Sequence, residues 1–158
     1  MLEENHYICT DCTHHFRINC EKYIKLLIDN MEYEEIAKNV SSIDPLNFEG
    51  KKKYVDQIQQ AQEKTGNKDA IKTILGKINS IEIVIAIMDF SFIGGSMGSV
   101  VGEKISRAID KAIDRELPLI IITASGGARM QEGAYSLMQM AKICSKLANF
   151  SEKGGFYI

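Results

Sequence analysis

The sequence predicts an α/β fold with a parallel pair of strands, and three observations support it. Residues 70–78 (AIKTILGKI) and 81–90 (IEIVIAIMDF) are runs rich in β-branched residues, which is typical of strands. Residues 99–117 (SVVGEKISRAIDKAIDREL) repeat apolar side chains at helical spacing. Two glycine-rich loops, 91–102 and 125–133, each join a predicted strand to a predicted helix. This order is that of βαβ units, whose strands are parallel.

Composition narrows the classes of protein to which the chain can belong. Its 158 residues are 45% hydrophobic and 25% charged, which is typical of one globular domain. A formal net charge of -2 gives no general attraction to nucleic acid or anionic lipid. The sequence has no run of the roughly 20 apolar residues that a membrane span requires, and it does not begin like a secretory signal. The four cysteines do not resemble a disulfide framework, so we expect a cytoplasmic location.

Two helices are predicted in the first part of the chain. Residues 21–40 place apolar side chains on roughly one helical face. Pro45 breaks the pattern, because the residue before a proline is disfavoured in a helix. Residues 51–64 predict a second, polar helix, and Gly66 suits the left-handed position that ends a helix.

The strands and the first long helix follow in order. The runs in residues 70–90 meet at Asn79-Ser80, which predicts a hairpin. The second run is apolar at successive positions, as in a strand that is buried on both faces. Pro118 opens the next strand, LIIITA, after the helix at 99–117. The apolar stripe of that helix consists of Ile105, Ala108, Ile109, Ala112 and Ile113.

A second long helix is predicted from about Met130 to Phe150, with Leu137, Ala141, Cys144 and Ala148 on one face. Because its neighbours are apolar, Cys144 is expected to be a buried, inert thiol. The methionines are expected to fill the core; they are Met130, Met138 and Met140. The final GGFYI is an apolar run after a glycine pair, and we expect it to begin a further strand that truncation cuts short.

The first glycine loop, SFIGGSMGSVVG, repeats glycine every four residues at Gly94, Gly98 and Gly102. On a helix this repeat leaves a strip of bare backbone that another helix or a ligand can approach closely. The loop is neither a P-loop nor a dinucleotide fingerprint, because it lacks both spacings. Spacing alone favours tight strand–helix packing over ligand binding.

The second glycine loop, SGGARMQEG, follows a predicted buried strand and precedes a helix. Consecutive glycines at 126 and 127 let backbone N–H groups point outward at a helix N-terminus, where they can bind an oxyanion. The alternative is a plain turn in which Ser125 caps the helix. Arg129 can bind a phosphate or carboxylate, or it can pair with Glu132. The residues by themselves leave these alternatives open.

Three stretches of the chain resemble one known family. MDFSFIGGSMGSVVGEK, PLIIITASGGARMQEGAYSLMQMAK and DPLNFEGKKKYVDQIQQAQEKTGNKDA are similar to the carboxyltransferase β subunit of bacterial-type acetyl-CoA carboxylase. The similarity runs from Cys9 to Ile158. The bacterial form resembles the chain more closely than the plastid form, so the cytoplasm is expected rather than the plastid stroma.

The resemblance implies a crotonase-like (ClpP-like) ββα spiral preceded by a zinc ribbon with four cysteines. Residues 1–20 would be the remnant of the ribbon, residues 21–66 a helical lead-in, and residues 67–158 the N-terminal part of the CoA carboxyltransferase domain. Only one CxxC pair is present, Cys9 and Cys12. The zinc site is therefore expected to be incomplete, because structural zinc takes four ligands. His14 or His15 is the alternative source of a further ligand.

The resemblance also implies a reaction and its partners. A carboxyl group moves from carboxybiotin, on the biotin carboxyl carrier protein, to acetyl-CoA, and malonyl-CoA for fatty-acid synthesis is formed. The expected partners are a separate α subunit in an α2β2 assembly, the carrier protein and biotin carboxylase. Gly126 and Gly127 match the family's first oxyanion loop, and biotin is the implied proton acceptor. The implied substrate-binding residues are Gly94, Gly95, Ser96, Met97, Gly98, Ser125, Ala128 and Arg129.

The family's second oxyanion loop has no counterpart in the sequence, so we expect the chain by itself to be inactive. One alternative keeps the chemistry but acts on another acyl-CoA, such as propionyl-CoA. A second is a zinc-ribbon module that binds nucleic acid through Arg17, Lys22 and Lys25, and the near-neutral charge argues against it. A third is a truncated product with a structural role only.

Overall fold

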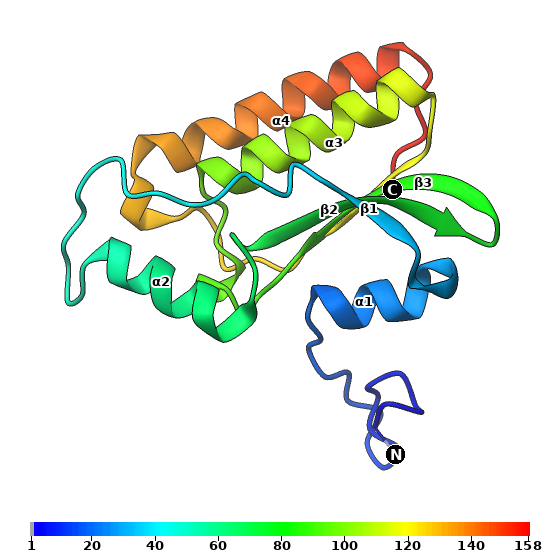
Figure 1. The fold of residues 1–158 in the computed structure, drawn as a ribbon, viewed down its shortest axis with the longest axis horizontal. Helices are drawn as coiled ribbons and strands as arrows, with labels where there is room; N and C mark the ends of the chain where they lie inside the picture. Colours follow the sequence, from blue (N-terminus) through cyan, green and yellow to red (C-terminus); the bar gives the residue numbers. More distant parts are fainter. Residues whose placement is uncertain (1) are drawn as a thin grey trace.

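The computed structural model describes residues 2–158 as a four-stranded sheet with helices on both faces (Figure 1). The strand order is β1-β2-β3-β4, in which β1, β2 and β3 pair antiparallel and β3 pairs parallel with β4. The elements are α1 (Cys20–Leu27), η1 (Asp29–Met31), β1 (Tyr33–Ile36), α2 (Tyr54–Thr65), β2 (Ile71–Ile78), β3 (Ile81–Met88), η2 (Ile93–Gly95), α3 (Ser99–Arg115), β4 (Leu119–Ile122), η3 (Met130–Glu132) and α4 (Ala134–Glu152).

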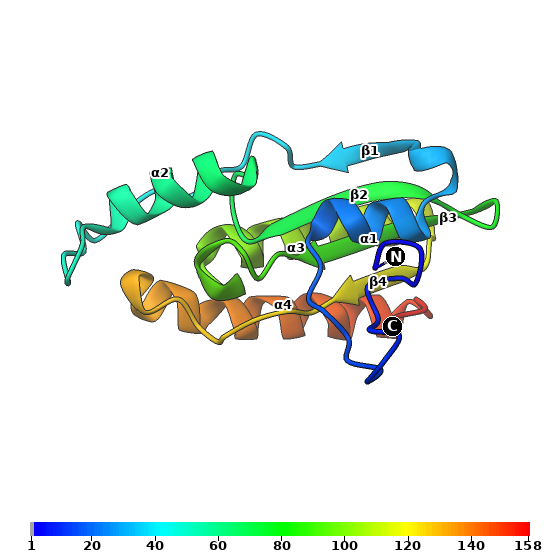
Figure 2. The same ribbon diagram turned by 90° about the horizontal axis from the view of Figure 1, so that it is seen from below.

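The alternating side chains of β3 build two cores, one on each face of the sheet. Val84, Ala86 and Met88 pack with the apolar stripe of α3. Ile83, Ile85 and Ile87 pack with α1, and Figure 2 shows α1 on the face opposite α3 and α4. The prediction of a strand buried on both faces is therefore confirmed.

Most predicted elements are confirmed by the structure. The hairpin turns at Asn79 and Ser80, both with positive φ, and the second polar helix ends at Gly66 in the left-handed conformation. The segment at 99–115 is helical, and its stripe faces the sheet core. The strand after Pro118 pairs parallel with β3, as the βαβ order predicts. Residues 156–158 pair with the free edge of β4, where the Leu119 N–H donates to the Phe156 carbonyl oxygen at 2.9 Å.

The predicted helix over 21–40 is wrong beyond Leu27. The helix α1 begins where the Asn19 side chain accepts the Lys22 N–H, and it ends at Leu27. Tyr33–Ile36 then form the edge strand β1 against β2. An unpaired edge of β2 would leave backbone donors and acceptors without partners. Because residues 33–36 pair with that edge, strand structure overrides the weak helical pattern of the segment.

The exposed face of α4 corrects a second expectation. The helix packs along α3, but Leu137, Met138 and Met140 are exposed, as is Cys144. Met130 ahead of it is 72% exposed, so neither the methionines nor Cys144 fill the core. Instead the packed side of α4 contributes Phe150 to the core, with Ile143 and Leu147 against it.

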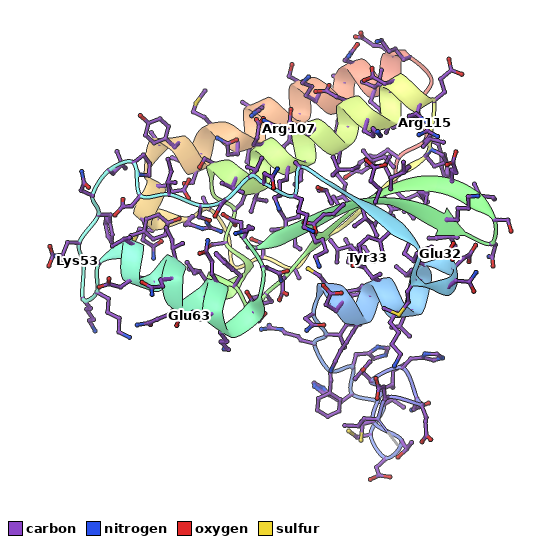
Figure 3. All side chains as sticks on the ribbon, in the orientation of Figure 1. Glu32, Tyr33, Lys53, Glu63, Arg107 and Arg115 are labelled. Atoms are coloured by element: carbon purple, nitrogen blue, oxygen red, sulfur yellow. The ribbon has the colours of Figure 1, made fainter. Side chains whose placement is uncertain are left out.

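Two ion pairs lie on the outer surface of α3. Figure 3 shows Arg107 and Arg115 on α3, and these pair with Glu103 at 2.7 Å and Glu82 at 3.1 Å. Both pairs are largely exposed, so each contributes little to stability. None of the helices in residues 2–158 is long and apolar enough to cross a membrane.

The buried thiol of Cys20 predicts a loss of stability at alkaline pH. It donates to the Ile87 carbonyl oxygen at 3.2 Å, and burial, with the charge of Asp89, raises its pKa from 9.0 to about 12. The unfolded thiol releases its proton at lower pH than the folded one. The stability that this difference supplies is therefore complete below about pH 9 and is lost as pH rises toward 12.

The measurement is denaturant unfolding of the wild type and of Cys20→Val through this pH range. The free energy of unfolding should fall less steeply with pH in Cys20→Val, whereas the exposed control Cys144→Val should follow the wild type. Parallel curves for the wild type and Cys20→Val would contradict the prediction.

Candidate functional site

The two glycine loops leave the carboxyl ends of the parallel strands β3 and β4 and pair with each other. The Gly126 N–H donates to the Gly94 carbonyl oxygen at 2.9 Å, and the Met97 N–H donates to the Gly127 carbonyl oxygen at 2.8 Å. The Arg129 N–H donates to the Met97 carbonyl oxygen at 3.0 Å. The predicted site residues are thus brought together at the sheet edge where α/β proteins usually bind ligands.

Gly95 makes the closest backbone contact between the loops. Its φ is +64°, in the left-handed region, and a Cβ there would overlap the Ala124 carbonyl oxygen. The same Cβ would lie 3.2 Å from the Phe90 Cα. Only glycine fits between these backbone atoms.

Residues 125–128 are the exposed part of the paired loops. Gly127 has φ +122°, and its N–H donates to the Ser125 Oγ at 3.0 Å. The Ala128 N–H has no hydrogen-bond partner in the described part of the chain. The Gly126 N–H is already used by Gly94, and its predicted oxyanion role stays a prediction.

A hollow opens beside this exposed stretch. Arg17 lies over the Phe90 ring, with its guanidinium carbon 3.9 Å from the ring centroid, a cation–π contact. The hollow is lined by Arg17, Ile18, Tyr23, Phe90, Thr123, Ala124 and Ser125. A positive charge therefore lines a hollow next to the second glycine loop.

Arg129 lies at the centre of a buried ionic network beneath the loops. Its guanidinium binds Asp69 through two hydrogen bonds of 2.6 and 2.9 Å and reaches Glu132 at 3.4 Å. It also donates to the Ser96 carbonyl oxygen at 2.6 Å and to the Ser96 Oγ at 3.1 Å. Burial lowers the pKa of the guanidinium, but the hydrogen bonds and charge of Asp69 outweigh this effect and raise it.

Glu132 joins this network to the start of α3. Its Oε2 accepts the Ser99 N–H at 2.6 Å, so a carboxylate occupies the positive N-terminus of the helix. A Cβ at Gly98 would lie 2.9 Å from both the Arg129 Nη1 and the Glu132 Cδ. Glycine at this position makes room for the ion pair, and its predicted role in substrate binding stays a prediction.

The predicted residues divide by accessibility. Ser125, Gly126, Gly127 and Ala128 are exposed, and Gly94, Ser96 and Met97 are partly buried. Gly95, Gly98 and Arg129 are buried. Gly102 packs against α4, because a Cβ there would lie 2.7 Å from the Gln139 Cβ. The glycine strip therefore serves packing at Gly98 and Gly102, as its spacing favours.

Asp69 and Tyr54 belong to the site although no local pattern in the sequence marks them. Both are fully buried, and Tyr54 donates to the Glu132 Oε1 at 2.6 Å. They lie 60 and 75 residues before Arg129, beyond the reach of local patterns. The one available signal is indirect, since a buried arginine requires a carboxylate partner. Asp89, another buried carboxylate, caps a turn by accepting the Ser91 N–H at 2.9 Å.

Cys9 and Cys12 lie on a small hairpin near the start of the chain. The Cys9 N–H donates to the His14 carbonyl oxygen at 2.8 Å. Hydrogen bonds from the Cys12 and Asp11 backbone lower the pKa of the Cys9 thiol, which favours the thiolate that binds metals. However, no group of three or more His, Cys, Asp or Glu side chains in residues 2–158 is placed to hold a metal ion. The pair by itself does not fit a structural zinc ion, and neither histidine completes it.

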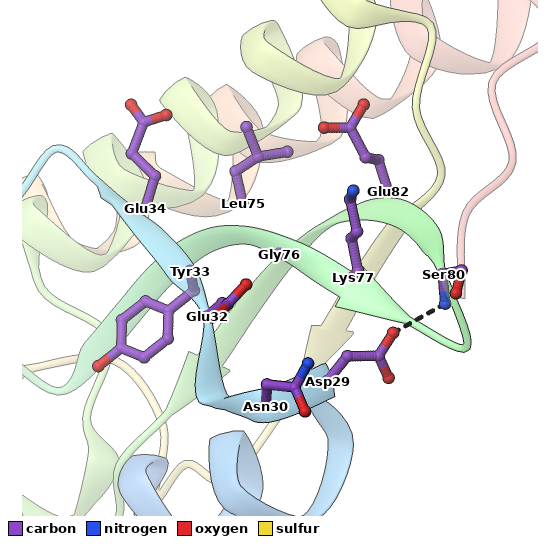
Figure 4. Close-up of a pocket in the computed structure, with 10 residues that line it drawn as sticks. All are labelled: Asp29, Asn30, Glu32, Tyr33, Glu34, Leu75, Gly76, Lys77, Ser80 and Glu82. Atoms are coloured by element: carbon purple, nitrogen blue, oxygen red, sulfur yellow. Dashed lines mark hydrogen bonds between the residues drawn. The ribbon is translucent and has the colours of Figure 1, made fainter.

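A separate hollow lies at the opposite end of the sheet, between η1, β1 and the β2–β3 hairpin (Figure 4). Asp29 holds the hairpin turn by accepting the Ser80 N–H at 2.7 Å and the Asn79 N–H at 3.0 Å. Three further carboxylates line it, Glu32, Glu34 and Glu82. Their charge disfavours an anionic ligand such as a CoA ester.

Comparisons with known proteins identify the family. Residues 30–158 match the family described as carboxyl transferase domain. The acetyl-coenzyme A carboxylase carboxyl transferase subunit beta of Christiangramia forsetii is 53% identical over 151 residues, which are 96% of this chain and 53% of that protein. The beta/alpha protein of Clostridium tetani is also 53% identical, over 99% of this chain and 27% of its own length. The chain thus spans about half the length of the curated beta subunits that it matches.

Solved structures share the fold at lower identity. Transcarboxylase 12S, crystallised with methylmalonyl-coenzyme A and methylmalonic acid, superposes with a TM-score of 0.71 at 24% identity, covering 85% of this chain and 24% of that one. A Pseudomonas malonate decarboxylase hetero-tetramer superposes with a TM-score of 0.64 at 20% identity, covering 86% of this chain and 48% of that one. At these identities the likeness is one of fold.

Proposed function

The chain belongs to the carboxyl transferase domain family, and we propose that it forms part of an acetyl-CoA carboxyltransferase β subunit. In this role it helps to transfer a carboxyl group from carboxybiotin to acetyl-CoA, which gives malonyl-CoA. The observation that carries the proposal is the pairing of two glycine loops at the carboxyl ends of β3 and β4, in a chain about half identical to beta subunits. The proposal includes a bacterial cytoplasmic location, which rests on the resemblance to the bacterial form.

The reaction requires a group that stabilises negative charge on the thioester oxygen. Removal of a proton from the acetyl methyl group places that charge on the oxygen as an enolate forms, and backbone donors can bind it. We assign this role to the N–H groups of Gly127 and Ala128. The first is released when the Ser125 hydroxyl turns away, and the second has no partner in residues 2–158. This proposal replaces the expected donor Gly126 by Ala128, because the Gly126 N–H is bound to the Gly94 carbonyl oxygen and holds the loop in place.

The rest of the proposed assembly lies outside the chain. Carboxybiotin on the carrier protein supplies the carboxyl group, and the α subunit completes the site in this proposal. The hollow beside Ser125, which Arg17 helps to line, is the proposed entry for the anionic CoA ester. Zinc, if bound in the whole protein, takes Cys9 and Cys12 as two of four ligands, and no step of the reaction goes through it.

The test is reconstitution. The chain is extended with the remaining half of a beta relative, combined with the α subunit, and assayed for carboxylation of acetyl-CoA and decarboxylation of malonyl-CoA. The proposal predicts turnover in both directions, with acetyl-CoA preferred to propionyl-CoA. A folded complex that turns over neither substrate would overturn the proposal, whereas a preference for propionyl-CoA would reassign the acyl group.

Gly127→Val is expected to abolish turnover in the reconstituted enzyme. The φ of +122° at Gly127 is unfavourable for a β-branched residue, so the loop should reorient its N–H groups. The loss of one oxyanion donor alone costs about 3 kcal/mol, a factor of a hundred or more in kcat. Nothing lies within 4 Å of the added Cβ, so the free energy of unfolding should fall only by the conformational cost, about 1–3 kcal/mol. Wild-type kcat in this variant would remove the oxyanion role from the loop.

A further inference from the structure

The helix α2, which precedes the strand-rich part of the chain, contacts the second glycine loop through Tyr54 and through Gln57, whose Oε1 accepts from the Gln131 Nε2 at 3.0 Å. Tyr54 is the first residue of α2, and its side chain is fully buried. Its hydroxyl donates to the Glu132 Oε1 at 2.6 Å and accepts from the Arg129 Nη1 at 3.1 Å. Burial raises the pKa of this hydroxyl, so Tyr54 stays a neutral donor. One hydroxyl thus orients both members of the buried ion pair.

Both members of the pair lie in the second glycine loop and bind the first. Arg129 binds the Ser96 carbonyl oxygen at 2.6 Å in the first glycine loop. Glu132 binds the Ser99 N–H at 2.6 Å and so fixes the start of α3. Both residues also belong to the second loop, whose exposed segment begins only four residues before Arg129. A shift of the pair would therefore move both loops together.

The other partner of Arg129 holds the pair from the side of the sheet. Asp69 lies two residues before β2, and its side chain also accepts from the Ser42 hydroxyl. Its two hydrogen bonds to Arg129 fix the plane of the guanidinium. Tyr54 determines where Arg129 and Glu132 stand relative to each other, since it is bonded to both.

We propose that Tyr54 is a positioning residue of the carboxyltransferase site, and that through the Arg129–Glu132 pair it sets the distance between the two glycine loops. The inference rests on the proposed function, because it assigns the proposed oxyanion donors to the second of these loops. Tyr54 touches no reacting atom. Its effect on the reaction arises because donors displaced by a fraction of an ångström bind a developing charge poorly.

The test compares Tyr54→Phe with Tyr33→Phe in the reconstituted complex. Phenylalanine keeps the buried ring and removes only the hydroxyl. Tyr33 is the matched control, because it lies on β1 and its hydroxyl makes no hydrogen bond within residues 2–158. Tyr54→Phe should lower kcat about tenfold to a hundredfold and leave the KM for acetyl-CoA within about twofold. Tyr33→Phe should match the wild type in both constants.

Hydrogen exchange supplies a readout that does not depend on activity. Amides in 94–99 and 125–133 should exchange faster in Tyr54→Phe than in the wild type, and those of the β2–β3 hairpin should not. If Tyr54→Phe does not fold, Glu132→Gln takes its place, because it keeps an acceptor for Ser99 and loses the charge. If the reconstituted wild type is inactive but the loops of Tyr54→Phe still exchange faster than those of the wild type, the positioning role is supported and the proposed function is overturned. Unchanged loop exchange, or an unchanged kcat in the folded variant, would overturn the positioning role.

Discussion

Replacement of Arg129 by methionine is expected to lower the free energy of unfolding by about 3–5 kcal/mol. Methionine fills much of the volume but leaves Asp69 and Glu132, both fully buried, without their cation. A buried carboxylate without a partner is unfavourable because the interior cannot replace its hydration. The loss is a large share of the roughly 5–15 kcal/mol by which a domain is stable.

Denaturant unfolding of Arg129→Met and of Arg107→Met measures this effect. Arg107 is the control because its pair with Glu103 on α3 is 53% exposed on the arginine side, and its loss should cost less than about 1 kcal/mol. Adding Asp69→Asn to Arg129→Met should recover part of the stability, because it neutralises one of the abandoned carboxylates. If the free energies of unfolding of Arg129→Met and Arg107→Met differ by less than about 1 kcal/mol, the buried network does not stabilise the loops as the structure indicates.

Gly95→Ala is expected to lower the free energy of unfolding by about 2–5 kcal/mol and to separate the two glycine loops. Two costs combine at this position. The left-handed conformation, φ +64°, disfavours any residue with a Cβ, and the added methyl group would overlap the Ala124 carbonyl oxygen. Because that neighbour is backbone and not a flexible side chain, the strand end must move.

Gly94→Ala is the matched control, since Gly94 has the same φ of +64° but a Cβ added there would have no atom within 4 Å. It should carry only the conformational cost, about 1–2 kcal/mol. The difference between the two variants therefore measures the steric contact between the loops. Turnover in the reconstituted enzyme should fall further in Gly95→Ala than in Gly94→Ala. Equal unfolding midpoints for the two variants would show that Gly95 does not pack against the Ala124 carbonyl oxygen as closely as the structure indicates.

The exposed face of α4 illustrates where local pattern misleads. Leu137 and Cys144 share a helical face with other apolar residues, which predicts burial, yet both are exposed. The periodicity shows which residues share a face of the helix, but it does not show whether another element covers that face. In residues 2–158 α3 packs against the other side, through Ile143 and Leu147. In the short strand β1 the local pattern gives the wrong type of element. The segment has a helical pattern, but it forms a strand because it pairs with β2.

The sequence by itself determined the elements that depend on neighbouring residues: the hairpin at Asn79 and Ser80, the strand buried on both faces, the stripe of α3, the cap at Gly66 and the two glycine loops. These features follow from backbone preference and periodicity, which act over a few residues. Only the tertiary structure decided that Arg129 is buried against Asp69 and Tyr54, and that Gly95 and Gly98 serve the contact between loops. The reason is that the energy of a buried charge depends on partners 60 and 75 residues away, which only the folded chain brings within hydrogen-bond distance.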